Sequence, residues 1–133
     1  MSPEALRTLL REAKTIAVVG LSPQRTRPSH RVAGYLRDAG YRVIPINPNH
    51  TTILGETSYP TLTAAAAADR IDIVDVFRRS EFAGPVVDEA IAFHPKLIWL
   101  QVGVLDADAR AVAAGIPCVM DRCLMIEHQR LRL

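Results

Sequence analysis

The sequence predicts an α/β fold in which helices cover both faces of a five-stranded parallel sheet. Two kinds of segment alternate along its 133 residues: short β-branched runs, and stretches whose apolar residues recur every three or four positions. The β-branched runs are almost continuously apolar, which is typical of strands buried on both faces of a parallel sheet. Since no repeat or low-complexity linker interrupts the alternation, residues 1–133 are expected to form a single domain.

Five apolar runs are assigned to strands. They are residues 15–19, 42–46, 71–77, 97–102 and 116–120. Right-handed crossovers through the intervening helices predict a Rossmann-like three-layer αβα arrangement with strand order 3-2-1-4-5. Ligands of such sheets bind at the carboxyl ends of the strands, near the switch point expected here between strands 1 and 4.

Helical spacing accounts for the connecting segments. The apolar faces are Leu6, Leu9, Leu10 and Ala13; Val32, Tyr35, Leu36 and Ala39; and Phe82, Val86, Ala90 and Phe93. Further helices are expected over 61–68, from an N-cap at Asp106 to Gly115, and over 123–131.

Composition excludes several classes of protein. With 16 basic and 14 acidic residues, the net charge of +2 is too balanced to indicate nucleic-acid binding. No apolar run reaches the roughly 18–20 residues that span a bilayer, and the N-terminus does not read as a signal peptide. A cytoplasmic location is therefore expected, with Cys118 and Cys123 as thiols whose spacing matches no metal motif.

The first strand ends in a loop suited to a phosphate. Gly20, Leu21 and Ser22 follow the strand, and Arg27 and Ser29 follow them. Ser29 is expected to cap a helix whose free N–H groups favour an anion, and Gly20 would let the backbone approach a pyrophosphate. A tight turn followed by solvated arginines fits equally well, because the G-x-G-x-x-G fingerprint is absent.

The next two strands end in residues that suit a nucleotide. Asn47 and Pro48 follow the second strand, where an NAD-binding domain usually carries a carboxylate for the ribose, which disfavours NAD. Phe77 and Arg78 follow the third strand and could stack on a purine and hold a phosphate. A core phenylalanine beside a surface arginine is the competing interpretation.

Gln101 and Gly103 end the fourth strand, and the coincidence of such features at every strand end favours a binding edge. No catalytic arrangement is visible, since the histidines are scattered. Cys123 stands at the start of the last helix, where a thiolate would be stabilised and could form a mixed disulfide with a thiol ligand. A buried structural cysteine is the alternative.

Taken together, these motifs resemble the CoA-binding family of small Rossmann-like proteins, related to the CoA-binding domain of the succinyl-CoA synthetase alpha subunit. The matching segments are 17–22, 27–29, 40–48, 72–79, 99–103 and 121–128. The resemblance implies a coenzyme A site at the carboxyl edge. In that site the pyrophosphate lies at Gly20, Leu21, Ser22, Arg27 and Ser29, the ADP portion at Asn47 and Pro48, the adenine and 3′-phosphate at Val76, Phe77 and Arg78, and the pantetheine along Gln101 and Gly103.

The implied function is binding of coenzyme A or an acyl-CoA by a non-catalytic carrier, sensor or regulatory module. Ligase activity is not implied, because the chain stops at Leu133, where the synthetase relatives continue into a ligase domain. The alternatives are an NAD(P)-dependent oxidoreductase-type domain and an interaction module that has lost its ligand.

Overall fold

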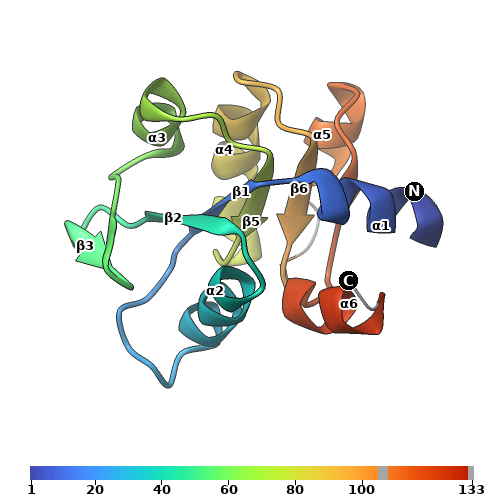
Figure 1. Cartoon of the computed structure of the whole chain (residues 1–133). Helices are drawn as coiled ribbons and strands as arrows, with labels where there is room; N and C mark the ends of the chain where they lie inside the picture. The colour runs from blue at the N-terminus through green and yellow to red at the C-terminus, as the bar shows by residue number, and fades with distance from the viewer. Residues whose placement is uncertain (105–107, 132–133) are drawn as a thin grey trace.

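The computed structural model describes residues 1–104 and 108–131 and has a parallel sheet as its middle layer (Figure 1). In spatial order the five strands of this sheet are β2 (Arg42–Ile46), β1 (Thr15–Val19), β5 (Ile73–Val76), β6 (Leu97–Leu100) and β7 (Cys118–Val119). All four neighbouring pairs run parallel. A small antiparallel hairpin, β3 (Thr52–Ile53) with β4 (Glu56–Thr57), lies beyond β2. The expected α/β Rossmann-like class is confirmed.

Helices form the two outer layers. One face is covered by α1 (Pro3–Glu12), α2 (Pro28–Asp38) and α6 (Leu124–Arg130), and the other by α3 (Leu62–Ala68), α4 (Ser80–Ile91) and α5 (Asp108–Ala113). Among the described residues, no helix is long and apolar enough to cross a membrane.

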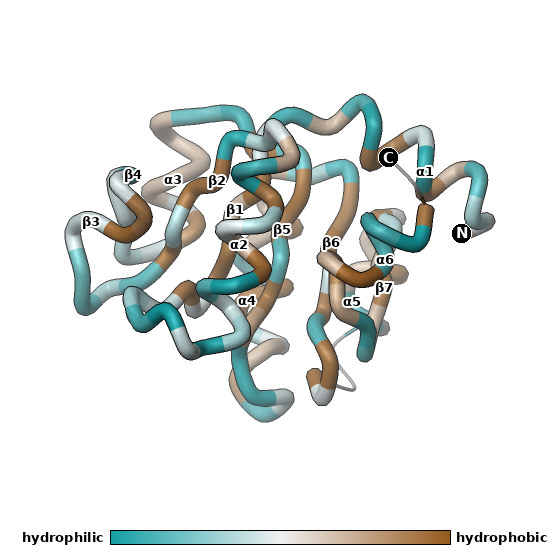
Figure 2. Tube along the Cα trace, turned by 60° about the horizontal axis from the view of Figure 1, so that its bottom comes forward, coloured by the Kyte–Doolittle hydropathy of each residue, from teal (hydrophilic) through white to brown (hydrophobic). Residues whose placement is uncertain are grey.

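Each central strand contributes to two separate cores. In β1, Ile16 and Val18 pack under α1, α2 and α6, whereas Ala17 and Val19 pack under α3 and α4. Burial on both faces explains why the strands are apolar at successive positions rather than at alternate ones. Figure 2 shows this hydrophobic colouring along β2 and β6.

The expected strand order 3-2-1-4-5 is corrected in one place. The third expected strand, now β5, pairs with β1 and not with β2, so the switch point lies between β1 and β5. Pro45 explains the difference, because a proline lacks the N–H of a central strand and belongs at an edge. The Pro45 carbonyl points to the outer edge of β2, where it accepts from the Tyr59 N–H at 3.0 Å.

Two helical details also differ from expectation. Helix α2 begins at Pro28 with Arg27 as its N-cap, so Ser29 lies inside the first turn instead of capping it. The buried face of α4 is Ala83, Gly84, Val87 and Ala90, which leaves Phe82 46% exposed beneath the Arg79 guanidinium, 5.4 Å from the ring centroid. The expected N-cap at Asp106 falls outside the described residues.

Strand β5 carries an ionisable group inside the core. Asp75 is fully buried, and neither carboxyl oxygen has a hydrogen-bond partner among the described residues. It lies opposite Val18 of β1 and Trp99 of β6. Burial alone raises the pKa of Asp75 well above its ordinary value, because the charged form loses its hydration.

Candidate functional site

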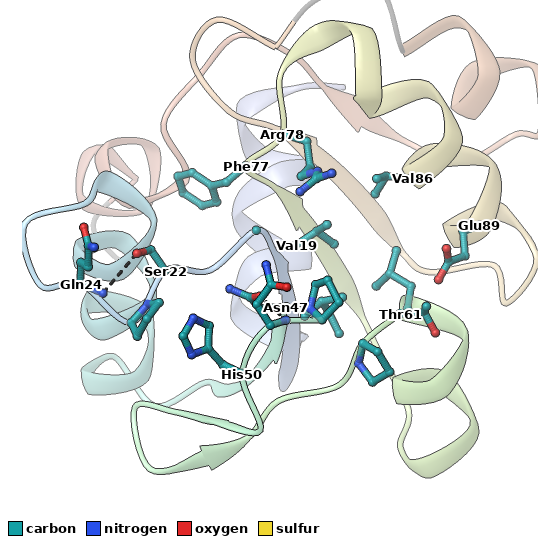
Figure 3. A pocket seen from close by; sticks show the side chains of 17 residues that line it. Val19, Ser22, Gln24, Asn47, His50, Thr61, Phe77, Arg78, Val86 and Glu89 are labelled. Carbon is teal, nitrogen blue, oxygen red and sulfur yellow. Dashed lines mark hydrogen bonds between the residues drawn. The ribbon is translucent and has the colours of Figure 1, made fainter.

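A pocket of about 500 Å³ opens at the carboxyl ends of β1, β2 and β5, at the observed switch point. Its volume is within the usual range for small-molecule sites, and its position is the expected one for ligands of open α/β sheets. Figure 3 shows the lining side chains, which come from three strand ends and from α3 and α4. They are Val19, Gly20, Ser22, Pro23, Gln24, Ile46, Asn47, Pro48, Asn49, His50, Pro60, Thr61, Leu62, Phe77, Arg78, Val86 and Glu89.

Gly20 lets the first loop pass directly over the end of β5. Its φ is +85°, and a Cβ built there would lie under 3.0 Å from the Phe77 carbonyl oxygen. The Gly20 N–H donates to the Ile46 carbonyl at 3.0 Å, and the Phe77 N–H donates to the Val19 carbonyl at 2.8 Å. Glycine is therefore required by backbone conformation and by space, and the close approach in the structure is to Phe77.

Two serine hydroxyls shape the loop between β1 and α2. The Ser22 N–H donates to Ser29 Oγ at 3.0 Å, and the Gln24 N–H donates to Ser22 Oγ at 3.1 Å. Arg27 Nε donates to Gln24 Oε1 at 3.3 Å on the exposed side of the loop. The loop is thus held by its own side chains, and Ser22 and Gln24 lie side by side at one edge of the pocket lining (Figure 3).

Asn47 joins the ends of β1 and β2. Its Nδ2 donates to the Leu21 carbonyl at 3.0 Å, and its Oδ1 accepts from the Asn49 N–H at 2.9 Å. An aspartate here would have no hydrogen to donate to Leu21. This explains in structural terms why an amide, and not a ribose-binding carboxylate, follows the second strand.

Charge in the pocket is divided between two sides of an apolar floor. Arg78 is exposed and extends toward the centre from the end of β5, whereas the half-buried Glu89 lies beside Thr61 at one end (Figure 3). Glu89 Oε1 accepts from the Thr63 N–H at 2.8 Å. The apolar floor is made of the aliphatic lining residues Val19, Ile46, Leu62 and Val86, and Figure 3 shows Val86 between Arg78 and Glu89.

The comparison with protein families is decisive for this chain. Residues 14–129 match the family described as CoA binding domain. The chain belongs to this CoA-binding family. It is 36% identical over 129 residues to YneT, an uncharacterized protein of Bacillus subtilis (strain 168), with coverage of 96% of this chain and 94% of YneT.

Solved structures share the fold of this chain. A Thermus thermophilus protein is 40% identical and superposes with a TM-score of 0.89 over 98% of this chain and 99% of its own. A dinucleotide-forming acetyl-coenzyme A synthetase from Ca. Korarchaeum cryptofilum, solved with phosphate and ADP, is 21% identical with a TM-score of 0.72. That match covers 85% of this chain and 27% of the synthetase, and at this identity it supports the shared fold alone.

The structure of this CoA-binding domain brings half of the predicted site residues into one pocket. Those that line it are Gly20, Ser22, Asn47, Pro48, Phe77 and Arg78. Leu21 and Val76 are fully buried, Arg27 is the N-cap of α2, and Ser29 lies in the first turn of α2 and accepts from the Ser22 N–H. A role of these four in binding stays a prediction.

Gln101 and Gly103 of the CoA-binding domain lie outside the pocket lining. Gln101 is buried, and its Oε1 accepts from the Leu124 N–H at 3.1 Å, which fixes the start of α6. The Gly103 N–H donates to Asp121 Oδ1 at 2.7 Å, and its carbonyl accepts from Ser80. Both residues tie strand ends together, and their predicted place along the pantetheine stays a prediction.

Sequence reasoning missed the helical wall of the pocket. Thr61, the N-cap of α3, lines it together with Val86 and Glu89 of α4. Val86 and Glu89 are three residues apart and so share a helix face, but nothing local shows which ligand site that face borders. Within the described residues, no cluster of three or more histidine, cysteine, aspartate or glutamate side chains could hold a metal ion.

Proposed function

We propose that this protein binds coenzyme A or an acyl-CoA in the carboxyl-edge pocket and acts as a non-catalytic carrier, sensor or regulatory module. The observation that carries the proposal is the composition of the pocket: one exposed arginine above an apolar floor, at the switch point of a CoA-binding fold. Such a site suits a ligand that combines phosphates with a flat apolar ring.

The donor set fits the adenosine end of the cofactor. The Arg78 guanidinium can hold a phosphate through two parallel hydrogen bonds. The apolar floor can bury an adenine face, and the open side of the pocket leaves room for the pantetheine arm. Phe77 also lines the pocket, but its ring points away from Arg78 in Figure 3 and packs partly against the core of the α1, α2 and α6 layer.

The pocket's nucleophiles support a non-catalytic role. Ser22 Oγ accepts from the Gln24 N–H, and the neighbouring His30 Nδ1 lies 3.0 Å from the Ser22 carbonyl oxygen, not from the hydroxyl. Among the described residues, no base is therefore aligned to activate Ser22. Cys123 stands at the N-cap of α6, outside the pocket lining.

The competing function is an NAD(P)-binding domain of the oxidoreductase type. It is disfavoured because the amide of Asn47 occupies the place of the usual ribose-binding carboxylate and is committed to Leu21 and Asn49. The third interpretation, an interaction module without a ligand, is disfavoured by a formed pocket of ordinary ligand size.

Isothermal titration calorimetry with coenzyme A, dephospho-coenzyme A, NAD and NADP tests the proposal. Trp99 is a poor fluorescent reporter, because it is fully buried beneath α6 and its indole N–H donates to the Arg122 carbonyl at 2.8 Å. We expect coenzyme A to bind and Arg78→Ala to weaken it about tenfold or more, the scale of a charge-assisted hydrogen bond. The matched control is Arg79→Ala, the next arginine, which does not line the pocket.

Two results would overturn the proposal. Binding of NAD without binding of coenzyme A would favour the oxidoreductase-type domain. An absence of heat with all four ligands, in protein shown to be folded, would favour the module without a ligand. Equal losses in the two arginine variants would remove Arg78 from the site.

A further inference from the structure

Glu89 is the one carboxylate among the described pocket-lining residues. It lies one helical turn after Val86 on α4, so the apolar floor leads directly to it. Figure 3 shows its side chain beside Thr61 at the edge of the pocket. A ligand in this pocket would therefore lie close to both a carboxylate and a guanidinium group.

The charges orient the ligand. A phosphate is attracted to Arg78 and repelled by Glu89, so the anionic part lies on the Arg78 side of the floor. The part that reaches Glu89 must not be anionic and must donate a hydrogen bond, because an ionised carboxylate repels negative charge and only accepts. One carboxyl oxygen is already used within the protein, since Oε1 accepts from the Thr63 N–H at 2.8 Å. The second, Oε2, has no hydrogen-bond or ion-pair partner among the described residues and is left for the ligand.

The apolar floor indicates which kind of ligand group carries the donor that reaches Glu89. The aliphatic lining residues are Val19, Ile46, Leu62 and Val86, of which Figure 3 shows Val86 between Arg78 and Glu89. Pro48 and Pro60 line the same pocket. Apolar walls of this kind suit the face of a purine, whose exocyclic amino group supplies a donor at the ring edge.

We propose that Glu89 accepts a hydrogen bond from the 6-amino group of the adenine ring and so makes the pocket selective for a 6-amino purine over a 6-oxo purine. This inference rests on the proposed function, since it assigns one end of the coenzyme A pocket. It also assigns a direction to the bound nucleotide, with the base toward α3 and α4 and the phosphates toward the β1 and β5 ends.

Glu89→Gln gives the sharpest test, because it changes the hydrogen-bonding pattern and keeps the shape. The single carbonyl oxygen of glutamine can still accept from the Thr63 N–H, which turns its NH₂ group toward the pocket. An NH₂ group opposes the 6-amino group of adenine but complements a 6-oxo group. The variant is therefore expected to reverse the preference of the protein and not merely to weaken it.

The experiment measures the dissociation constants of coenzyme A and its deaminated 6-oxo analogue for the full chain by calorimetry. We expect the wild type to bind coenzyme A about tenfold more tightly than the analogue. Glu89→Gln should bring this ratio to one or below. The control Glu81→Gln makes the same chemical change on the same helix, outside the pocket lining, and should keep the wild-type ratio. A ratio taken on one variant is unaffected by partial loss of folded protein.

The outcomes separate this inference from the proposed function. If the wild type does not bind coenzyme A, the proposed function itself fails. If it binds coenzyme A and the analogue equally, or prefers the analogue, the assignment of Glu89 is overturned and the proposed function stands. Equal weakening of both ligands by Glu89→Gln would also overturn it, because a contact to the ribose or a purely structural role predicts that result.

Discussion

Gly20→Ala tests whether the contact between the first loop and the end of β5 holds the pocket together. The Gly20 φ of +85° costs a residue with a side chain about 1–2 kcal/mol. The added Cβ would also meet the Phe77 carbonyl oxygen at under 3.0 Å, and it would lie 3.2 Å from the Phe77 carbonyl carbon. Because those atoms belong to the backbone, relief requires the loop and β5 to move apart, and forced packing of this kind costs about 1–3 kcal/mol.

Gly103→Ala is the matched control for the conformational part of this cost. Its φ of +84° is nearly the same, and a Cβ there would have no atom of the described residues within 4 Å. Alanine also recovers about 0.4–1 kcal/mol by restricting the unfolded chain, which applies to both variants. We therefore expect the free energy of unfolding to fall by about 1 kcal/mol in Gly103→Ala and by about 2–4 kcal/mol in Gly20→Ala.

Urea unfolding followed by far-ultraviolet circular dichroism measures both values. A loss of about 2–4 kcal/mol is a large share of the roughly 5–15 kcal/mol that stabilise an ordinary domain, so the difference between the variants is easily resolved. Equal losses in the two variants would refute the reasoning, because they would mean that the Phe77 contact adds nothing to the backbone cost. Coenzyme A titration of Gly20→Ala should also show weaker binding, since Phe77 and Arg78 must shift.

Three further substitutions test one unpartnered buried carboxyl group and two hydrogen bonds near the pocket. Burial raises the pKa of Asp75, so the wild type loses stability as pH rises from the ordinary pKa of aspartate through the raised one. Asp75→Asn should remove this loss. The unfolding free energy of the variant relative to the wild type, measured in urea, should therefore increase from pH 4 to pH 8. Parallel pH profiles of wild type and variant would contradict this. Asn47→Asp should lower the unfolding free energy by about 1 kcal/mol, because the Leu21 carbonyl loses its donor, and unchanged stability would show that this bond is dispensable. Ser29→Ala should cost about 1–3 kcal/mol by leaving the Ser22 N–H without an acceptor, and an unchanged thermal midpoint would count against the loop description.

Local patterns in the sequence were sufficient for the fold class. Strands and helices follow from β-branched runs and apolar spacing, which depend on neighbours in the chain. The short helix expected over 61–68 is α3, with Thr61 as its N-cap. Strand order depends on pairing between distant segments, so it was the part of the fold that pattern alone misplaced. Pro45 was a usable signal, because a proline inside the second strand already indicates an edge.

The part of the candidate site formed by strand ends was predictable from the sequence, whereas the part formed by helices was not. Gly20 and Asn47 directly follow β1 and β2, and Arg78 is the second residue after β5, so the carboxyl-edge rule places them together. Glu89 comes from the far part of α4, and its place depends on how that helix packs on α3. Gln101 also follows the end of a strand, but that strand, β6, lies on the far side of β5 from β1. Its side chain accepts from the Leu124 N–H at the start of α6 and does not line the pocket.

The placement of the pocket between β1 and β5 means that its two walls belong to opposite layers of the molecule. The wall that contains Ser22 is the loop before α2, which covers one face of the sheet. The wall that contains Glu89 is part of α4, which covers the other face. These walls pack into different cores, so either can change in sequence without repacking the opposite one. Proteins built on this sheet are therefore free to diverge in what one end of the crevice recognises while conserving the other end.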